Sequence, residues 1–226
     1  MLKKRVKNIL ESSQAAGWVL EPDAKKLFAL SGIKVPEFKT AKTLNKAIKA
    51  AGDIGYPVAA KVVSPKVLHK SDANGVVIGI DSDEELKNAF NHFVTMDGFE
   101  CMLIEEMVDG VELIVGGKID YQFGPVVILG IGGTSVEIYK DTSLKMAPLK
   151  ENDVQSMVRS LKAHELLDGY RGSEPINMKD LISMMINFSR LLVDLRDSID
   201  SIDLNPVMCS AKQCVVADAR IILSRE

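Results

Sequence analysis

Cysteine is scarce in this sequence, and its few copies are not arranged as a site. The 226 residues contain three, Cys101, Cys209 and Cys214, and none has the spacing of metal ligands. An odd number of cysteines, placed in or beside apolar runs, argues against a complete disulfide framework. We therefore expect a protein of a reducing compartment, the cytoplasm.

A large charge excess and a long apolar run are also missing. A net charge of -3 provides no basic footprint for nucleic acid. No uninterrupted apolar stretch follows the basic residues 1–7, so we expect neither a signal peptide nor a membrane span. Repeats and low-complexity segments are absent as well. With 26% charged and 46% hydrophobic residues, the composition is that of an ordinary globular protein.

The apolar pattern predicts helices and strands in an irregular order. Helices are expected over 21–30 and 43–52, from a capping box at Ser82 through Phe93, and from Asn177 onward. Strands are expected over 57–63, 75–80, 102–105, 111–119, 125–129, 136–139, 144–149, 199–208 and 214–223.

The connections between these strands bear on the fold class. Sequential strands joined by such short turns should be antiparallel, because a parallel crossover needs a dozen or more residues. The order of elements indicates an α+β fold rather than the regular alternation of a doubly wound sheet. A first subdomain would close near Gly98.

Two residues around the first pair of strands could carry chemistry. Lys61 interrupts an apolar strand, where a buried ammonium would need an anion such as a phosphate. The alternative is an edge strand with Lys61 in solvent. His69 lies in the polar loop that follows, where its neutral imidazole could attack phosphorus while Lys70 holds the transferred oxygens. The alternative is a plain solvated histidine.

Two further segments could contact a nucleotide. The stretch 104–112 contains glutamates that could accept hydrogen bonds from ribose hydroxyls beside strand-end backbone that reads adenine; the alternative is a charged turn. Gly130-Ile-Gly-Gly133 could bring backbone N–H groups onto a phosphate. It has neither the dinucleotide-binding nor the Walker A spacing, so a tight turn is its default interpretation.

The last pair of strands suggests a metal site. Asp203 and Asn205 alternate onto one strand face, and Asp218 interrupts the strand expected beside it. Magnesium uses a few such oxygen ligands and completes its shell with nucleotide phosphates and water. The alternative is a turn at Asn205-Pro206 with an incidental aspartate.

Taken together, these segments resemble the ATP-grasp β subunit of the archaeal-type ADP-forming acetyl-CoA (acyl-CoA) synthetases, related to the β subunit of succinyl-CoA synthetase. The likeness covers nearly the whole chain, from Leu20 to Leu223. The motifs that carry it are Gly55-Tyr-Pro-Val-Ala-Ala-Lys61, Ser64-Pro65, His69-Lys-Ser-Asp72, Phe123-Gly-Pro125, Gly130-Ile-Gly-Gly133, Ala147-Pro148, Arg171-Gly172 and Asp203-Leu-Asn-Pro206.

The resemblance implies an ATP-grasp fold, with two α+β subdomains over 17–100 and 101–226 gripping a nucleotide between their sheets. The first would carry the phosphohistidine loop and the second the metal site. It also implies residue roles. Lys61, Glu105, Met107 and Glu112 would bind the nucleotide, Asn205 and Asp218 would bind Mg²⁺, His69 would be phosphorylated and Asp203 would steady it. Lys70, Lys145 and Arg171 would be further anion contacts.

The implied enzyme is an acid-thiol ligase, acetate–CoA ligase (ADP-forming). Its reversible reaction is acyl-CoA + ADP + phosphate to carboxylate + CoA + ATP. The phosphoryl group would pass from a CoA-binding α subunit to this chain and then to ADP, in an α2β2 assembly with Mg²⁺ and ATP/ADP. Nucleic acid and membrane have no part in it. Lysine and magnesium would offset charge, and the histidine would divide one long transfer into short steps.

Three positions depart from the family pattern: Asn74, Lys145 and Tyr170 stand where a glycine, an arginine and a small residue are usual. Asn tolerates a left-handed backbone and Lys keeps the charge, so activity is compatible with these changes. Two other functions stay open. One is a stand-alone ATP-grasp carboxylate-amine ligase, which needs no histidine relay; the other is a non-catalytic nucleotide-binding regulatory subunit.

Overall fold

The computed structural model describes residues 2–133 and 141–224, and these form two compact units. One unit is Pro36–Val108; the other joins Met1–Val35 to Asp109–Glu226. These bounds differ from the expected division at 17–100 and 101–226. The reason is strand pairing, because β1 (Trp18–Val19) forms an antiparallel pair with β11 (Ala219–Leu223) at the far end of the sequence.

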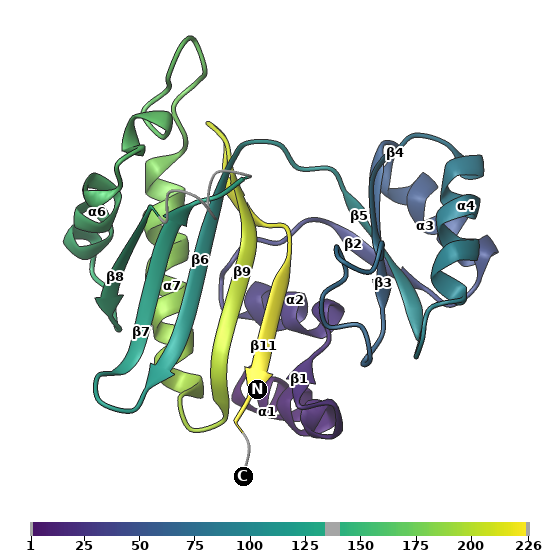
Figure 1. The fold of residues 1–226 in the computed structure, drawn as a ribbon, viewed down its shortest axis with the longest axis horizontal. Coiled ribbons are helices and arrows are strands. Elements are labelled where there is room, and N and C mark those ends of the chain that lie inside the picture. Colours follow the sequence, from purple (N-terminus) through teal and green to yellow (C-terminus); the bar gives the residue numbers. More distant parts are fainter. Residues whose placement is uncertain (1, 134–140, 225–226) are drawn as a thin grey trace. The chain divides into compact units, whose positions relative to one another are not determined.

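The Pro36–Val108 unit is a sheet covered by two helices. Its strands lie in the order β2 (Phe38–Ala41), β5 (Cys101–Glu106), β3 (Val58–Val63) and β4 (Val76–Ile80), and neighbours are antiparallel. Helices α3 (Leu44–Ile54) and α4 (Asp83–Val94) share a core with one face of this sheet (Figure 1). That face carries Val58, Ala60 and Val62, so the alternating Ala59 and Lys61 belong to the opposite face.

The larger unit contains the second sheet. Among the described residues its strands run β1, β11, β9 (Ile199–Cys209), β6 (Val111–Asp120), β7 (Gly124–Ile131) and β8 (Thr142–Met146), and β10 (Cys214–Val216) pairs with β9. Every pair is antiparallel, as expected. The other elements are α1 (Leu2–Ser13), α2 (Glu21–Leu30), α6 (Glu151–Ser160), α7 (Met178–Leu195) and 3-10 turns at Gln14–Ala16 and His164–Leu166.

The helices of this unit share one core with the sheet, and α7 lies along β6, β7 and β9 (Figure 1). The buried strand residues Val115, Ile202 and Leu204 belong to that core. Because side chains alternate along a strand, Glu112, Asp203 and Asn205 fall on the opposite face. Glu112, Asp203 and Asn205 therefore lie on the face of the second sheet that points away from the helix-covered core.

Local signals explain where several elements begin. Ser82 Oγ accepts a hydrogen bond from Glu85 N at the start of α4, and Asn177 Oδ1 accepts one from Asp180 N at the start of α7. The α1 helix was not expected. The strand predicted over 214–223 is divided into β10 and β11 around Asp218, and the strand predicted over 136–139 lies outside the described residues.

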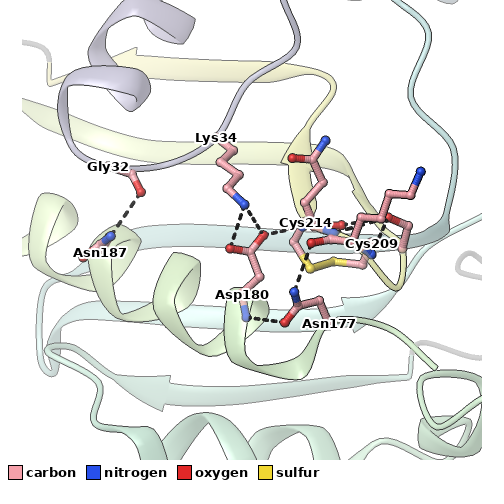
Figure 2. Close-up of polar contacts among 10 residues, drawn as sticks. Gly32, Lys34, Asn177, Asp180, Asn187, Cys209 and Cys214 are labelled. Atoms are coloured by element: carbon pink, nitrogen blue, oxygen red, sulfur yellow. Dashed lines mark hydrogen bonds and ion pairs between the residues drawn. A yellow bond between two sulfur atoms is a disulfide. The ribbon is translucent and has the colours of Figure 1, made fainter.

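A disulfide closes the β9–β10 hairpin. Cys209 and Cys214 face each other in register and are bonded, whereas Cys101 is a buried thiol outside this pair. Asp180, in the first turn of α7, accepts hydrogen bonds from Cys214 N at 2.7 Å and Lys34 Nζ at 3.0 Å (Figure 2). The hairpin is thus tied to α7 and to the segment after α2.

None of the helices in the two described ranges combines the length and apolar character needed to cross a membrane.

Candidate active site

The loop between β3 and β4 presents His69 to solvent while its two ends are fixed. At the first end, Ser64 Oγ donates to Asp97 O at 2.6 Å and accepts from Lys66 N at 3.0 Å. At the second, Gly75 N donates to Lys70 O at 2.7 Å. His69 is exposed between these anchors. An exposed imidazole on an anchored loop can meet a phosphoryl donor from outside the chain.

The second anchor depends on two special backbone positions. A Cβ at Gly75 would lie 2.5 Å from Val62 Cγ1 and 3.1 Å from Lys70 O, so only glycine fits there. Asn74 has a φ of 55°, the left-handed conformation that asparagine tolerates. The asparagine at this position is therefore compatible with the turn that follows Lys70, as its chemistry predicts.

Lys61 is buried beside a carboxylate. It is 6% exposed, and its Nζ lies 2.9 Å from Oε2 of Glu105, which is 2% exposed. The alternative of an edge strand with Lys61 in solvent is wrong, because β3 lies between β5 and β4. In the register Ala59 is opposite Glu105, which puts Lys61 and Glu105 diagonally on the same face. The sequence marks both residues as candidates, but their pairing depends on the β3–β5 register.

Met107 belongs to the Pro36–Val108 unit and Glu112 to the larger unit. Met107 follows β5 and is half-buried. Glu112, on β6, is exposed, and its carbonyl oxygen accepts a hydrogen bond from Gly132 N at 2.6 Å. A Cβ at Gly132 would lie 2.8 Å from that oxygen, so glycine permits this close approach. The first two residues of the segment Gly130–Gly133 are thus the last two residues of strand β7, and the segment packs against β6.

Asn205 and Asp218 are neighbours through their main chains. Asn205 N donates to Asp218 O at 3.2 Å, and Ala217 N and Asp218 N both donate to Pro206 O, at 3.0 and 3.4 Å. Asn205 is exposed and Asp218 is half-buried. The division of the predicted last strand at Asp218 is therefore the feature that brings a carboxylate residue beside an amide residue.

These two residues fit a magnesium ion. Among residues 2–133 and 141–224, no group of three or more His, Cys, Asp or Glu side chains forms a metal cage. Mg²⁺ needs no such cage, because it takes one or two carboxylates and fills its octahedron with phosphate oxygens and water. An aspartate carboxylate and an asparagine amide oxygen are hard donors of the kind it prefers.

Asp203 is paired with Arg220, a residue without a recognisable motif in the sequence. Its Oδ2 lies 3.3 Å from an Arg220 guanidinium nitrogen, and the two residues are opposite each other in the β9–β11 register. Asp203 and Asn205 share a strand face, as predicted. A long-range register decides which cation meets Asp203, so local sequence patterns carry no signal for it.

Lys145 lies away from these residues. It pairs in register with Val127, which belongs to the helix-covered core, and its Nζ is 3.3 Å from Asp153 Oδ1 at the start of α6. The Lys150 backbone N–H, and secondarily Lys145, lower the pKa of the Asp153 carboxyl. The structure thus brings Lys145 together with α6 rather than with Asp203, Asn205 and Asp218.

Arg171 and Tyr170 form a local pair in the connection before α7. The Arg171 guanidinium lies over the Tyr170 ring, 5.2 Å from its centroid. Arg171 has a φ of 53°, which is uncommon for a residue with a Cβ. Both side chains are exposed. Tyr170 therefore serves at least as a stacking surface for the arginine that the sequence marks as an anion contact.

Known proteins resemble this chain over nearly its whole length. The family model for the ATP-grasp domain matches residues 11–223. The β subunit of acetate–CoA ligase [ADP-forming] I from Pyrococcus furiosus is 40% identical over 97% of this chain and 98% of its own length. The β subunit of succinate–CoA ligase [ADP-forming] from Haloarcula marismortui is 29% identical over 87% of this chain and 52% of its length.

A solved structure of acetyl-coenzyme A synthetase 1 from Ca. Korarchaeum cryptofilum matches with a TM-score of 0.85 and 38% identity. It covers 97% of this chain and 100% of the matched chain. That protein is in complex with coenzyme A and Mg-AMPPCP, with its phosphohistidine segment pointing towards the nucleotide-binding site.

Two antiparallel sheets and the match to residues 11–223 define an ATP-grasp protein, a class that binds nucleotides. Within that class, the chain belongs to the family of β subunits of ADP-forming acetyl-CoA synthetases, which is related to the succinyl-CoA synthetase β subunits.

Proposed function

We propose that His69 carries a phosphoryl group between ADP/ATP and a partner subunit. In the ATP-consuming direction, an imidazole nitrogen of His69 attacks the γ-phosphorus of ATP. The bond from that phosphorus to the bridging oxygen breaks, ADP leaves with the electron pair, and the imidazolium formed by the attack loses its proton. The exposed position of His69 on a doubly anchored loop, in a chain of this family, is the observation that carries the proposal.

Other residues support the nucleotide and its charge. Lys61, oriented by Glu105, is proposed to contact the phosphates, with backbone at Met107 on adenine and Glu112 on the ribose hydroxyls. Asn205 and Asp218 are proposed to hold Mg²⁺, which would offset charge on the transferring phosphoryl group. Asp203 is proposed to steady the phosphorylated His69, with Lys70 and Arg171 as anion contacts. Positioning and charge compensation supply most of the catalysis in such transfers.

The whole reaction requires a second chain. We propose that a CoA-binding α subunit forms the acyl-CoA bond and that the assembly is α2β2, working on acetate or a related carboxylate in the cytoplasm. The relative from Pyrococcus furiosus is itself a β subunit, which supports a separate partner. Cytoplasmic disulfides are uncommon but occur, so the bond between Cys209 and Cys214 is compatible with this location.

The test is intact-protein mass after incubation with Mg-ATP, for wild type and His69→Ala. We expect one acid-labile phosphate on the wild type and none on the variant. His92→Ala is a matched control, because His92 is also exposed, on α4, and should leave phosphorylation unchanged.

Two outcomes would contradict the proposed role of His69. If wild-type chain acquires no phosphate even with the candidate α subunit and an acyl phosphate present, the histidine relay is wrong. If His69→Ala retains full ATP-dependent turnover of a carboxylate with an amine, the chain is a ligase that needs no relay.

A further inference from the structure

A buried ion pair lies inside helix α2, away from the sheet face that carries Asn205. Lys25 is 0% exposed and Glu21 is 3% exposed, and Lys25 Nζ lies 3.0 Å from Glu21 Oε1 one turn away. Removing two charges from water costs about as much as their attraction returns, so such a pair is a poor stabilising device. Its presence calls for another role.

The ammonium also reaches a distant part of the chain. Lys25 Nζ donates a hydrogen bond to Ala217 O at 2.8 Å, across a sequence separation of 192 residues. Ala217 and Asp218 form the two-residue connection between β10 and β11. A charged donor makes this bond stronger than a neutral one would. The cation in α2 therefore holds the main chain immediately before Asp218.

The same connection is held from its other side. Ala217 N and Asp218 N donate to Pro206 O, and Asp218 O accepts from Asn205 N. The Lys25 bond adds a contact from α2 to the Ala217 carbonyl of the same connection. The Ala217-Asp218 connection is thus held by hydrogen bonds to β9 on one side and to α2 on the other.

We propose that Lys25 is a positioning residue for the metal site. It fixes the Ala217-Asp218 main chain so that the Asp218 carboxylate stays beside Asn205, and it thereby sets the affinity of this site for Mg²⁺. Glu21 compensates the charge of Lys25 and orients its ammonium. This inference rests on the proposed function, because it takes Asn205 and Asp218 as the magnesium ligands.

The experiment measures AMPPCP binding to the full chain by calorimetry over a series of Mg²⁺ concentrations. Lys25→Met should raise the half-saturating Mg²⁺ concentration roughly tenfold, the low end of the effect of losing an outer-shell partner. Hydrogen exchange at the Ala217 and Asp218 amides should quicken in the same variant. Lys25→Arg keeps the charge and the donors, so it should restore part of the affinity.

Controls separate positioning from stability. Leu27→Ala, in the same helix and equally buried, should lower the melting temperature without changing the Mg²⁺ requirement. If Lys25→Met folds poorly, the double variant Glu21→Met/Lys25→Met removes both charges and should fold with the same Mg²⁺ defect.

Two results would contradict the role of Lys25 while keeping the metal assignment, provided that Asp218→Asn raises the Mg²⁺ requirement. The first is a wild-type Mg²⁺ requirement in both Lys25→Met and Lys25→Arg. The second is an increase of the Mg²⁺ requirement in Leu27→Ala as large as that in Lys25→Met. If Asp218→Asn leaves the Mg²⁺ requirement unchanged, the metal assignment in the proposed function fails, and the role of Lys25 fails with it.

Discussion

Lys61 and Glu105 combine a cost to folding with the proposed use of Lys61 in binding the nucleotide. An ion pair at 2.9 Å between two side chains that are almost fully buried has given up most of its hydration. A well-packed apolar pair in the same strands would be at least as stable. The ammonium is thus held at a defined point of the sheet with its charge already compensated, which suits a group that must meet phosphate oxygens without reorganising.

We expect Lys61→Met to lower the free energy of unfolding by about 3–5 kcal/mol, because Glu105 then keeps its charge without the Lys61 ammonium. The double variant Lys61→Met/Glu105→Met should recover most of that loss, yet still fail to bind ADP. Urea denaturation measures the first effect and calorimetry the second. A double variant that binds ADP normally would remove Lys61 from the nucleotide site.

Single residues also show what local sequence can and cannot reveal. A lysine in an apolar strand is visible without a structure, and so is its need for an anion. Its counterion is not, because Glu105 is about forty positions away and meets Lys61 only through the β3–β5 register. Lys25 carries no local signal of its contact, because its partner Ala217 is 192 positions distant.

Elements were easier to predict, because caps and alternation are local. The caps at Ser82 and Asn177 lie where the sequence places them, and the hairpin that presents His69 follows from two apolar runs around a polar loop. The division of the last strand at Asp218 escaped prediction. It depends on Pro206 O and Lys25 Nζ, which are contributed by other parts of the fold.

Asp153, in the first turn of helix α6, makes the stability of this element depend on pH. The Lys150 backbone N–H, then Lys145, lower the folded-state pKa of Asp153 from its ordinary 3.8. A lowered folded pKa means that the stabilisation is fully present above the unfolded pKa and is lost as pH falls through the folded pKa. We expect Asp153→Asn to cost about 1 kcal/mol at pH 7, the size of a helix cap, because the exposed ion pair adds little.

Denaturant unfolding from pH 8 to pH 3 measures this difference. It should stay constant down to about pH 5 and shrink below about pH 4. Lys145→Met is the matched control: it keeps the Lys150 hydrogen bond, so most of the acid dependence of the wild type should remain. If the difference in unfolding free energy between wild type and Asp153→Asn grew as the pH falls, the stabilising role of the ionised Asp153 would be wrong.

At the scale of the whole molecule, the sequence outlines two sheets but not the path of the chain through them. The expected boundary at 100 follows the order of elements. The observed larger unit instead includes Met1–Val35, because β1 pairs with β11 and α2 packs against that strand. A two-residue strand such as β1 is too short to produce a recognisable sequence pattern, so its pairing with β11 could not be predicted.

The disulfide between Cys209 and Cys214 makes the stability of the protein depend on reducing conditions. The disulfide closes a loop of about six residues between β9 and β10, for which chain entropy predicts about 2 kcal/mol of stabilisation. Dithiothreitol should therefore lower the unfolding free energy of the wild type by about that amount, and should have no effect on Cys209→Ala/Cys214→Ala. Cys101→Ala is the control that keeps the full response to reductant.

Alkylation with iodoacetamide in denaturant counts the thiols directly. Without reductant, intact mass should show one label, at Cys101; after reduction it should show three. Three labels on protein kept under nitrogen from a cytoplasmic extract, falling to one after exposure to oxidant, would mean that the hairpin is closed outside the cell and open within it. Because that hairpin also carries Asn205 and leads into Asp218, its redox state would then bear on the proposed metal site as well as on stability.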